Sequence, residues 1–104
     1  TIIRHYKFEY NKKLLQKIKK YRQITKEALA KIGLKKGLSK KDQKTAKDFL
    51  SMCKNYFSDA AHFEKKGDHA NALAALSYAH AWLDAGVRAK LFDAKGDSRL
   101  FTLP

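Results

Sequence analysis

The sequence predicts an all-α fold: a three-helix bundle with a long basic first helix and an antiparallel hairpin formed by the second and third helices. Apolar residues recur every three or four positions over most of the chain, which is the spacing of residues on one helix face. Residues that favour helix ends stand at the limits of these periods. With 104 residues, 44% of them hydrophobic and 32% charged, the chain has the size and composition of a single globular domain, residues 1–104.

The first predicted helix covers residues 8–32. Gly33 follows its last apolar residue and can adopt the left-handed conformation that commonly ends a helix. The loop 33–39 comes next, and it has no phosphate-loop pattern because no strand precedes it and no Gly-Lys-Ser/Thr follows. The apolar face of this helix consists of Tyr10, Leu14, Ile18, Tyr21, Thr25, Ala28 and Ile32, widened by Leu15 and Leu29.

The second and third predicted helices cover residues 40–66 and 69–92, and Ser39 and Asp68 precede them as N-caps. Because only about three residues connect these helices, they must run antiparallel. This arrangement pairs Phe49 with Val87, Cys53 with Leu83, Tyr56 with His80 and Ala60 with Leu76. The prediction is therefore one core seam made of Phe49, Cys53, Tyr56, Ala60, Leu76, Leu83 and Val87.

The third helix has a second apolar stripe, roughly opposite the first, made of Tyr78, Trp82, Ala85 and Ala89. A helix that is apolar on two sides is covered on both. Two interpretations are open: the first helix or the tail covers this stripe, or the stripe is an interface for another protein. The tail, residues 93–104, is expected to pack back onto the bundle, although a partner-binding peptide has the same composition. Its three large apolar residues are Leu100, Phe101 and Leu103.

The net charge of +13 is confined to the first half of the chain. Residues 1–47 hold 16 basic and 3 acidic residues, whereas residues 48–104 hold 7 of each. Lys12, Lys19 and Lys26 repeat every seven positions on the side of the first helix away from the core, and such a ridge can follow a phosphate backbone. No aromatic side chain alternates with these lysines, so base stacking is not indicated. A lysine-rich solvated surface of a heat-adapted protein explains the ridge equally well.

Few residues suit catalysis or metal binding. Cys53 is the single cysteine, which excludes an intramolecular disulfide and a cysteine zinc cluster and suits a reducing compartment. Two pairs with ligand spacing, His80 with Asp84 and Asp59 with His62, do not converge in the predicted hairpin. We instead expect a half-buried His80 that hydrogen-bonds to a tyrosine hydroxyl or to Asp84. The sequence therefore predicts no catalytic residue, no cofactor-binding residue and no metal ligand, and a protein that is not an enzyme.

Two resemblances to known protein families support the prediction of a helical fold. Gly67-Asp68, followed by Ala72-Leu73, resembles the turn and second helix of a tetratricopeptide repeat, but no second copy is visible, so a single hairpin is implied. The longer stretch from Tyr56 to Ala85, with its distinctive Ser-Tyr-Ala-x-x-x-Leu-Asp-Ala segment, is similar to the archaeal family of short helical proteins known as domain of unknown function 357. This resemblance implies a compact helical bundle and an archaeal origin, and it implies no activity. Lys90 stands where this family leads us to look for a glycine.

These features predict a non-catalytic protein-interaction module that binds another protein, or a second copy, through Tyr78 and Trp82 or through the tail. The alternative is a weakly specific nucleic-acid-binding module that uses Lys12, Lys19 and Lys26. No apolar run approaches the roughly 20 residues that a membrane span needs. The first residues contain neither the apolar region of a signal peptide nor an initiator Met. We therefore expect a cytoplasmic protein without membrane contact, whose N-terminus is trimmed or truncated.

Overall fold

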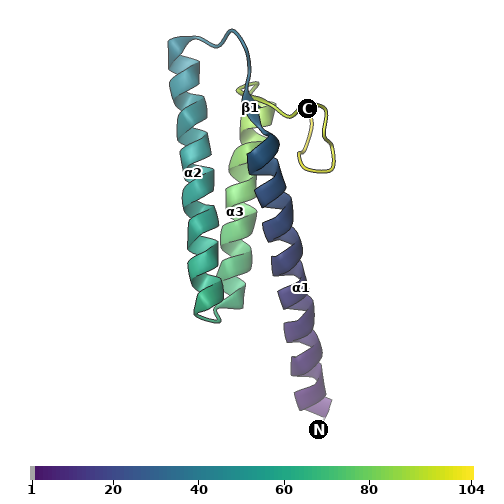
Figure 1. Ribbon diagram of the computed structural model, residues 1–104. Coiled ribbons are helices and arrows are strands. Elements are labelled where there is room, and N and C mark those ends of the chain that lie inside the picture. Colours follow the sequence, from purple (N-terminus) through teal and green to yellow (C-terminus); the bar gives the residue numbers. More distant parts are fainter. Residues whose placement is uncertain (1) are drawn as a thin grey trace.

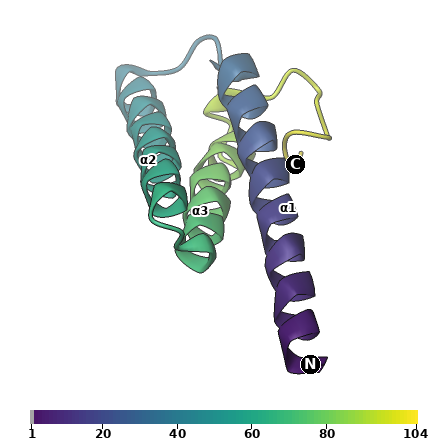
Figure 2. The same ribbon diagram turned by 60° about the horizontal axis from the view of Figure 1, so that its bottom comes forward.

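The computed structural model describes the backbone of residues 2–104 and the side chains of residues 12–104. Within these residues it contains three helices, α1 (Ile2–Lys31), α2 (Lys40–Lys65) and α3 (His69–Arg88), and two short strands, β1 (Gly33–Leu34) and β2 (Phe92–Asp93). The prediction of an all-α bundle is confirmed. α3 lies between α1 and α2 and makes most of the contacts between helices (Figures 1 and 2). None of the helices in the described part of the chain is both long and apolar enough to cross a bilayer.

The hairpin of α2 and α3 begins and turns as predicted. The Ser39 hydroxyl accepts a hydrogen bond from the backbone N–H of Asp42 at 3.1 Å, and the Asp68 carboxylate accepts one from that of Asn71 at 3.3 Å. Gly67 has a φ of 75°, a left-handed conformation that costs other residues roughly 1–2 kcal/mol. The two caps and this glycine allow the tight turn that makes the helices antiparallel.

Four of the predicted helix ends are displaced, among them the end of α1, which is Lys31 rather than residue 32. α1 begins at Ile2 rather than at residue 8, and α2 ends at Lys65 rather than at residue 66. The predicted start of α1 followed its apolar period, but a helix continues beyond that period where no glycine or proline interrupts it. The predicted core residue Tyr10 lies outside the residues whose side chains are described.

The end of α3 differs most from the prediction, because the helix stops at Arg88 and not at residue 92. Lys90 takes a left-handed conformation with a φ of 61°. The backbone N–H of Leu91 then donates to the carbonyl oxygen of Gly86 at 2.9 Å, a bonding pattern that closes helices. β2, beginning at Phe92, pairs antiparallel with β1. The apolar period runs on from the helix into this strand, which is why periodicity alone placed the end too late.

The predicted seam between α2 and α3 is confirmed for five of its residues, because Cys53, Ala60, Leu76, Leu83 and Val87 are buried. Phe49 and Tyr56 are only partly buried. The ring of Phe49 packs edge to face against Trp82, with the centroids 5.1 Å apart. The ring of Tyr56 packs in the same way against Tyr78 at 4.5 Å. The predicted pairing of Tyr56 with His80 is therefore wrong, since Tyr78 and His80 project from different sides of α3.

The covered face of α1 is narrower than predicted because α1 packs mainly against α3. Ile18, Thr25 and Ala28 are buried. Leu15 and Tyr21, which the prediction assigned to the same face, are 47% and 41% exposed. A helix covered from one side buries a single stripe, so the residues at the edges of that stripe remain in contact with solvent.

The tail packs back onto the bundle, as predicted. Leu100 and Phe101 are each 3% exposed, whereas Leu103 remains 36% exposed. The ammonium group of Lys31 donates a hydrogen bond to the carboxylate of Asp97 at 2.8 Å and ties the tail to the end of α1. The tail therefore completes the core between α1 and α3.

Candidate functional site

The exposed side of α3 is almost free of charge. Within this helix the only Asp, Glu, Lys or Arg residues are Asp84 and Arg88. By contrast, the exposed positions of α2 and of the described part of α1 are mostly charged or polar. We call the exposed side opposite His80 the outer face; it consists of the exposed Ala74, Tyr78, Ala81 and Ala85 and the partly buried Trp82. An exposed apolar face of this kind, next to strongly charged surfaces, is typical of an interaction site.

Two of the sequence-predicted site residues form the centre of the outer face. Tyr78 is 53% exposed, and its ring centroid lies 6.3 Å from that of Trp82. Trp82 is partly buried against Phe49 of α2. The interpretation that the first helix or the tail covers this stripe is therefore wrong: α2 covers one edge of it, and the rest is exposed. Ala89, the fourth residue of the predicted stripe, is the exposed C-cap of α3.

Two grooves flank Tyr78. One, of about 370 Å³, lies between the lower halves of α2 and α3 as drawn in Figure 1 and contains a single charged residue, Asp59. Its lining residues are Tyr56, Asp59, Phe63, Asn71, Ala74, Ala75 and Tyr78. The other, of about 220 Å³, is lined by Tyr78, Ala81, Trp82 and Ala85. Tyr78 thus stands as a projection between two shallow apolar recesses.

His80 holds α1, α3 and the tail together on the opposite side of α3. Its Nε2 donates a hydrogen bond to the backbone carbonyl oxygen of Leu100 at 2.7 Å, and its Nδ1 lies 3.1 Å from the hydroxyl of Thr25. In the neutral ring, Nδ1 accepts from that hydroxyl. The expected partners were a tyrosine hydroxyl or Asp84, and this expectation is wrong. The Asp84 carboxylate lies 3.9 Å away and instead accepts a hydrogen bond from the backbone N–H of Thr102 at 2.8 Å.

The arrangement does not bring the possible metal ligands together. Asp59 and His62 are exposed on α2, whereas His80 and Asp84 face α1 and the tail. Among the residues that the structure describes, no three His, Cys, Asp or Glu side chains gather around one point. Cys53 is fully buried, and burial raises the pKa of its thiol to about 12, so the thiol stays protonated near neutral pH.

The three lysines predicted to contact polyanions, Lys12, Lys19 and Lys26, are all exposed on α1. Figure 1 shows that the N-terminal end of α1 extends beyond the α2–α3 hairpin, while the rest of the helix lies beside α3. Because all three side chains are exposed, these lysines form an accessible positive edge.

Sequence reasoning missed a second basic region at the opposite end of the molecule. There the β1–β2 pairing brings Lys35 and Lys36 next to Lys90 and Lys95, around one cleft. The signal that could have pointed to it is Lys90, a lysine at a position where a helix ends and glycine is favoured. The pairing itself depends on contacts between residues about 60 positions apart, which a local pattern does not encode.

The fold and surface define a small helical protein with an uncharged outer face and two basic regions. The family model "Protein of unknown function (DUF357)" matches residues 20–92, and the chain belongs to this family. The matched span begins at Lys20 within α1 and covers all of α2 and α3. No curated protein and no solved structure matches the chain.

Proposed function

We propose that this protein is a non-catalytic protein-interaction module whose outer face on α3 binds the same face of a second copy. The observation that carries the proposal is the exposed and uncharged outer face, with Tyr78 projecting between two grooves. Aromatic residues that are partly exposed are enriched in protein interfaces because they offer a large contact area together with a polar end.

The outer face offers a projection and a recess side by side. A two-fold interface brings the same patch of both copies together, so it needs a projection and a recess side by side. Tyr78 supplies the projection, and the groove beside Ala81 and Ala85 supplies the recess. The small side chains of these alanines also let a second helix approach closely, since the distance between packed helices depends on the residues at their contact.

The distribution of charge favours contact through this face. Two copies that each carry a net charge of +13 repel one another. The surplus lies in residues 1–47, whereas residues 48–104, which include α3 and most of α2, hold equal numbers of basic and acidic residues. Contact through the outer face therefore keeps the lysine-rich surfaces of the two copies apart.

Analytical ultracentrifugation of the purified protein tests this proposal. At about 0.15 M salt, which limits repulsion to about 8 Å, the mass should rise with concentration from 11.9 kDa towards twice that value. Ala81→Glu places a charge on the outer face and should abolish the association. Ala61→Glu makes the same change at an exposed alanine of α2 that lines neither groove, and should have no effect. A wild-type protein that stays monomeric, or two variants that behave alike while remaining helical by circular dichroism, would contradict the proposal.

A second candidate function is weakly specific nucleic-acid binding through α1, which the accessible ridge of Lys12, Lys19 and Lys26 favours. Each phosphate contact made by a lysine releases bound counterions, so affinity falls steeply with salt. Changing the three lysines together to glutamine should weaken duplex binding at about 0.15 M salt and give a shallower salt dependence. The control variant instead changes three exposed lysines at or near α2: Lys54, Lys65 and the C-cap residue Lys66. If both variants bind like the wild type, or the wild type does not bind at this salt concentration, the ridge is only a solvated surface.

The proposal also includes a cytoplasmic location and the absence of catalysis. The protonated and buried thiol of Cys53 supports both parts, because it is not a nucleophile and needs no oxidising compartment. The hydrogen bonds of His80 to Thr25 and Leu100 support the second part, since they give this histidine a structural role.

A further inference from the structure

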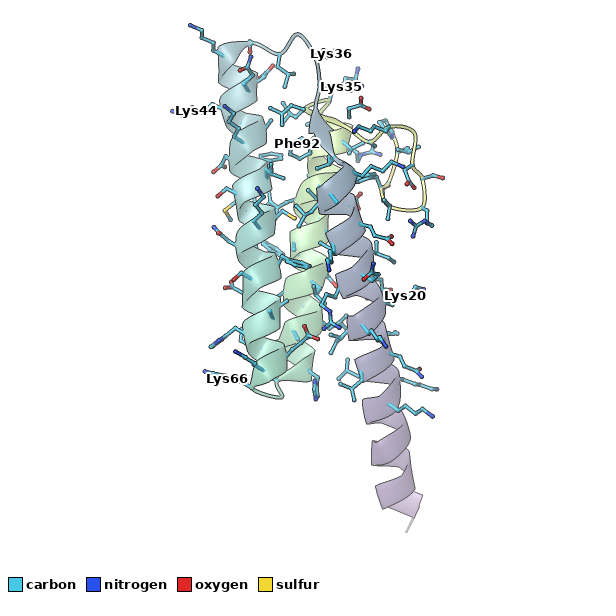
Figure 3. All side chains as sticks on the ribbon, viewed as in Figure 1. Lys20, Lys35, Lys36, Lys44, Lys66 and Phe92 are labelled. Atoms are coloured by element: carbon cyan, nitrogen blue, oxygen red, sulfur yellow. The ribbon has the colours of Figure 1, made fainter. Side chains whose placement is uncertain are left out.

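A cleft of about 460 Å³ lies where β1 and β2 meet the end of α3. Three segments form it: the connection between β1 and α2, the end of α3, and the tail. Four lysines line the cleft: Lys35, Lys36, Lys90 and Lys95. Figure 3 shows Lys35 and Lys36 on the connection after β1, with Phe92 close to that strand. Asp93 is the one acidic residue among the lining residues.

The lysines of this cleft carry an excess of positive charge. No ion pair joins any of the four to a carboxylate within residues 12–104. The Asp93 carboxylate accepts a hydrogen bond from the backbone N–H of Lys95 at 2.8 Å, which holds the turn. Four lysine side chains therefore line one recess that has a single acidic side chain, and such an arrangement attracts an anion.

The backbone at two of these lysines is unusual. Lys90 and Lys95 have φ angles of 61° and 53°, and they are the only residues other than glycine with positive φ in the described chain. Glycine adopts this conformation with less strain. A favourable interaction with the helix dipole accounts for a cation at Lys90, at the end of α3. It does not account for Lys95, which lies in a turn beyond β2, or for Lys35. All four lysines line the cleft, and this is the feature that they share.

We propose that this cleft binds a small phosphorylated ligand that also has an apolar part, such as a nucleoside diphosphate. Lysine binds phosphate as a point charge, whereas recognition of a planar carboxylate favours the fork of arginine, and no arginine lines the cleft. A terminal phosphate carries about 1.5 to 2 negative charges near neutral pH and the inner phosphate of a diphosphate carries about one, so a diphosphate matches the surplus of the site. The apolar part contacts the wall of the cleft, in which Leu38, Leu103 and Pro104 keep exposed surface whereas Val87 and Phe92 are buried. This site is separate from the outer face of α3 and independent of the function proposed for it.

Calorimetric titration of the full chain with ADP, pyrophosphate and inorganic phosphate at about 0.15 M salt tests the proposal. ADP should bind, and replacing the four cleft lysines by glutamine should weaken binding at least about tenfold. The matched control replaces four exposed lysines of α2 at the same end of the molecule, Lys40, Lys41, Lys44 and Lys47, and should change the affinity less than about threefold. Absence of ADP binding, or an equal loss in both variants, would overturn the site. Pyrophosphate binding as tightly as ADP would overturn the role of the apolar wall.

The variant Lys90→Gly tests whether Lys90 contributes to ligand binding or only to the structure of the turn. Glycine suits the φ of 61° better than lysine does, so this variant should melt at a higher temperature than the wild type. It also removes one of the four charges and should bind ADP several-fold more weakly. A variant that is more stable and binds ADP as the wild type does would show that Lys90 has no part in binding.

Discussion

Replacing Gly86 by alanine tests how tightly the end of α3 packs against β2. A methyl group at this position would lie within 3.0 Å of two ring carbons of Phe92 and 3.1 Å from a third. The ring of Phe92 is 1% exposed and is held in place by the β1–β2 pairing, so it has little room to move. Either the ring or the strand must therefore shift in the variant.

The expected loss of stability follows from two opposing effects. Overpacking a well-packed core costs about 1–3 kcal/mol, and the full burial of Phe92 places this site near the upper value. Gly86 lies inside a helix with an ordinary negative φ, so alanine also stabilises the helix by about 1 kcal/mol. The net loss in the free energy of unfolding should be about 2 kcal/mol, a decrease in melting temperature of roughly 10 °C for a domain of this size.

Urea unfolding followed by circular dichroism measures this loss. Gly33→Ala is the matched control, because a Cβ there meets nothing within 4 Å and the backbone φ is not positive, and it should change stability by less than about 0.5 kcal/mol. Introducing Gly86→Ala together with Phe92→Leu removes the ring that the methyl would touch, so the loss caused by Gly86→Ala should become smaller in that background. If Gly86→Ala is as stable as the wild type, or its cost is unchanged beside Phe92→Leu, the close packing of Phe92 on α3 is wrong.

Three further changes test other parts of the structure. Leu83→Ala, at a fully buried position of the α2–α3 seam, should cost about 2–5 kcal/mol in urea unfolding, and a loss below about 0.5 kcal/mol would place Leu83 outside the core. The thiol of Cys53, with its pKa raised to about 12 by burial, should react with Ellman's reagent at pH 8 only when urea unfolds the chain; rapid reaction of the folded protein would contradict its burial. The hydrogen bond from Lys31 lowers the pKa of Asp97 below 3.8, so this contact stabilises the fold above that pH and is lost as the pH falls through the lowered pKa. Lys31→Gln should raise the Asp97 pKa measured by NMR, and an unchanged pKa would exclude the contact.

The helices could be predicted from the sequence because their causes are local. Ser39 and Asp68 accept the hydrogen bonds that start α2 and α3, and the apolar spacing of each helix sets the side that becomes buried. The short turn at Gly67 then leaves only an antiparallel arrangement. For the same reason, the pairing of Cys53 with Leu83 in one seam follows from counting residues away from the turn.

The features that escaped prediction depend on contacts between distant segments. A periodic pattern shows that two sides of α3 are apolar, but not which neighbour covers each side, and so it pairs His80 with α2 rather than with α1 and the tail. Thr25 and Leu100, its actual partners, lie 55 and 20 residues away along the chain. The β1–β2 pairing is equally non-local, and with it the cleft formed by lysines from separate segments.

One side of α3 packs against α1 and the tail and the other is exposed, so the proposed interface can be changed without disturbing the core. On one side, His80 joins α1 and the tail by partly buried hydrogen bonds, and removing a partner from such bonds costs stability. On the outer face, Ala81 is exposed and contributes little to the core of the monomer. A charge at Ala81 should therefore abolish self-association and leave the melting temperature of the monomer unchanged. His80→Ala should lower the melting temperature and leave the outer face itself intact. If Ala81→Glu destabilises the monomer as much as His80→Ala does, the outer face belongs to the core and is not available to a second copy.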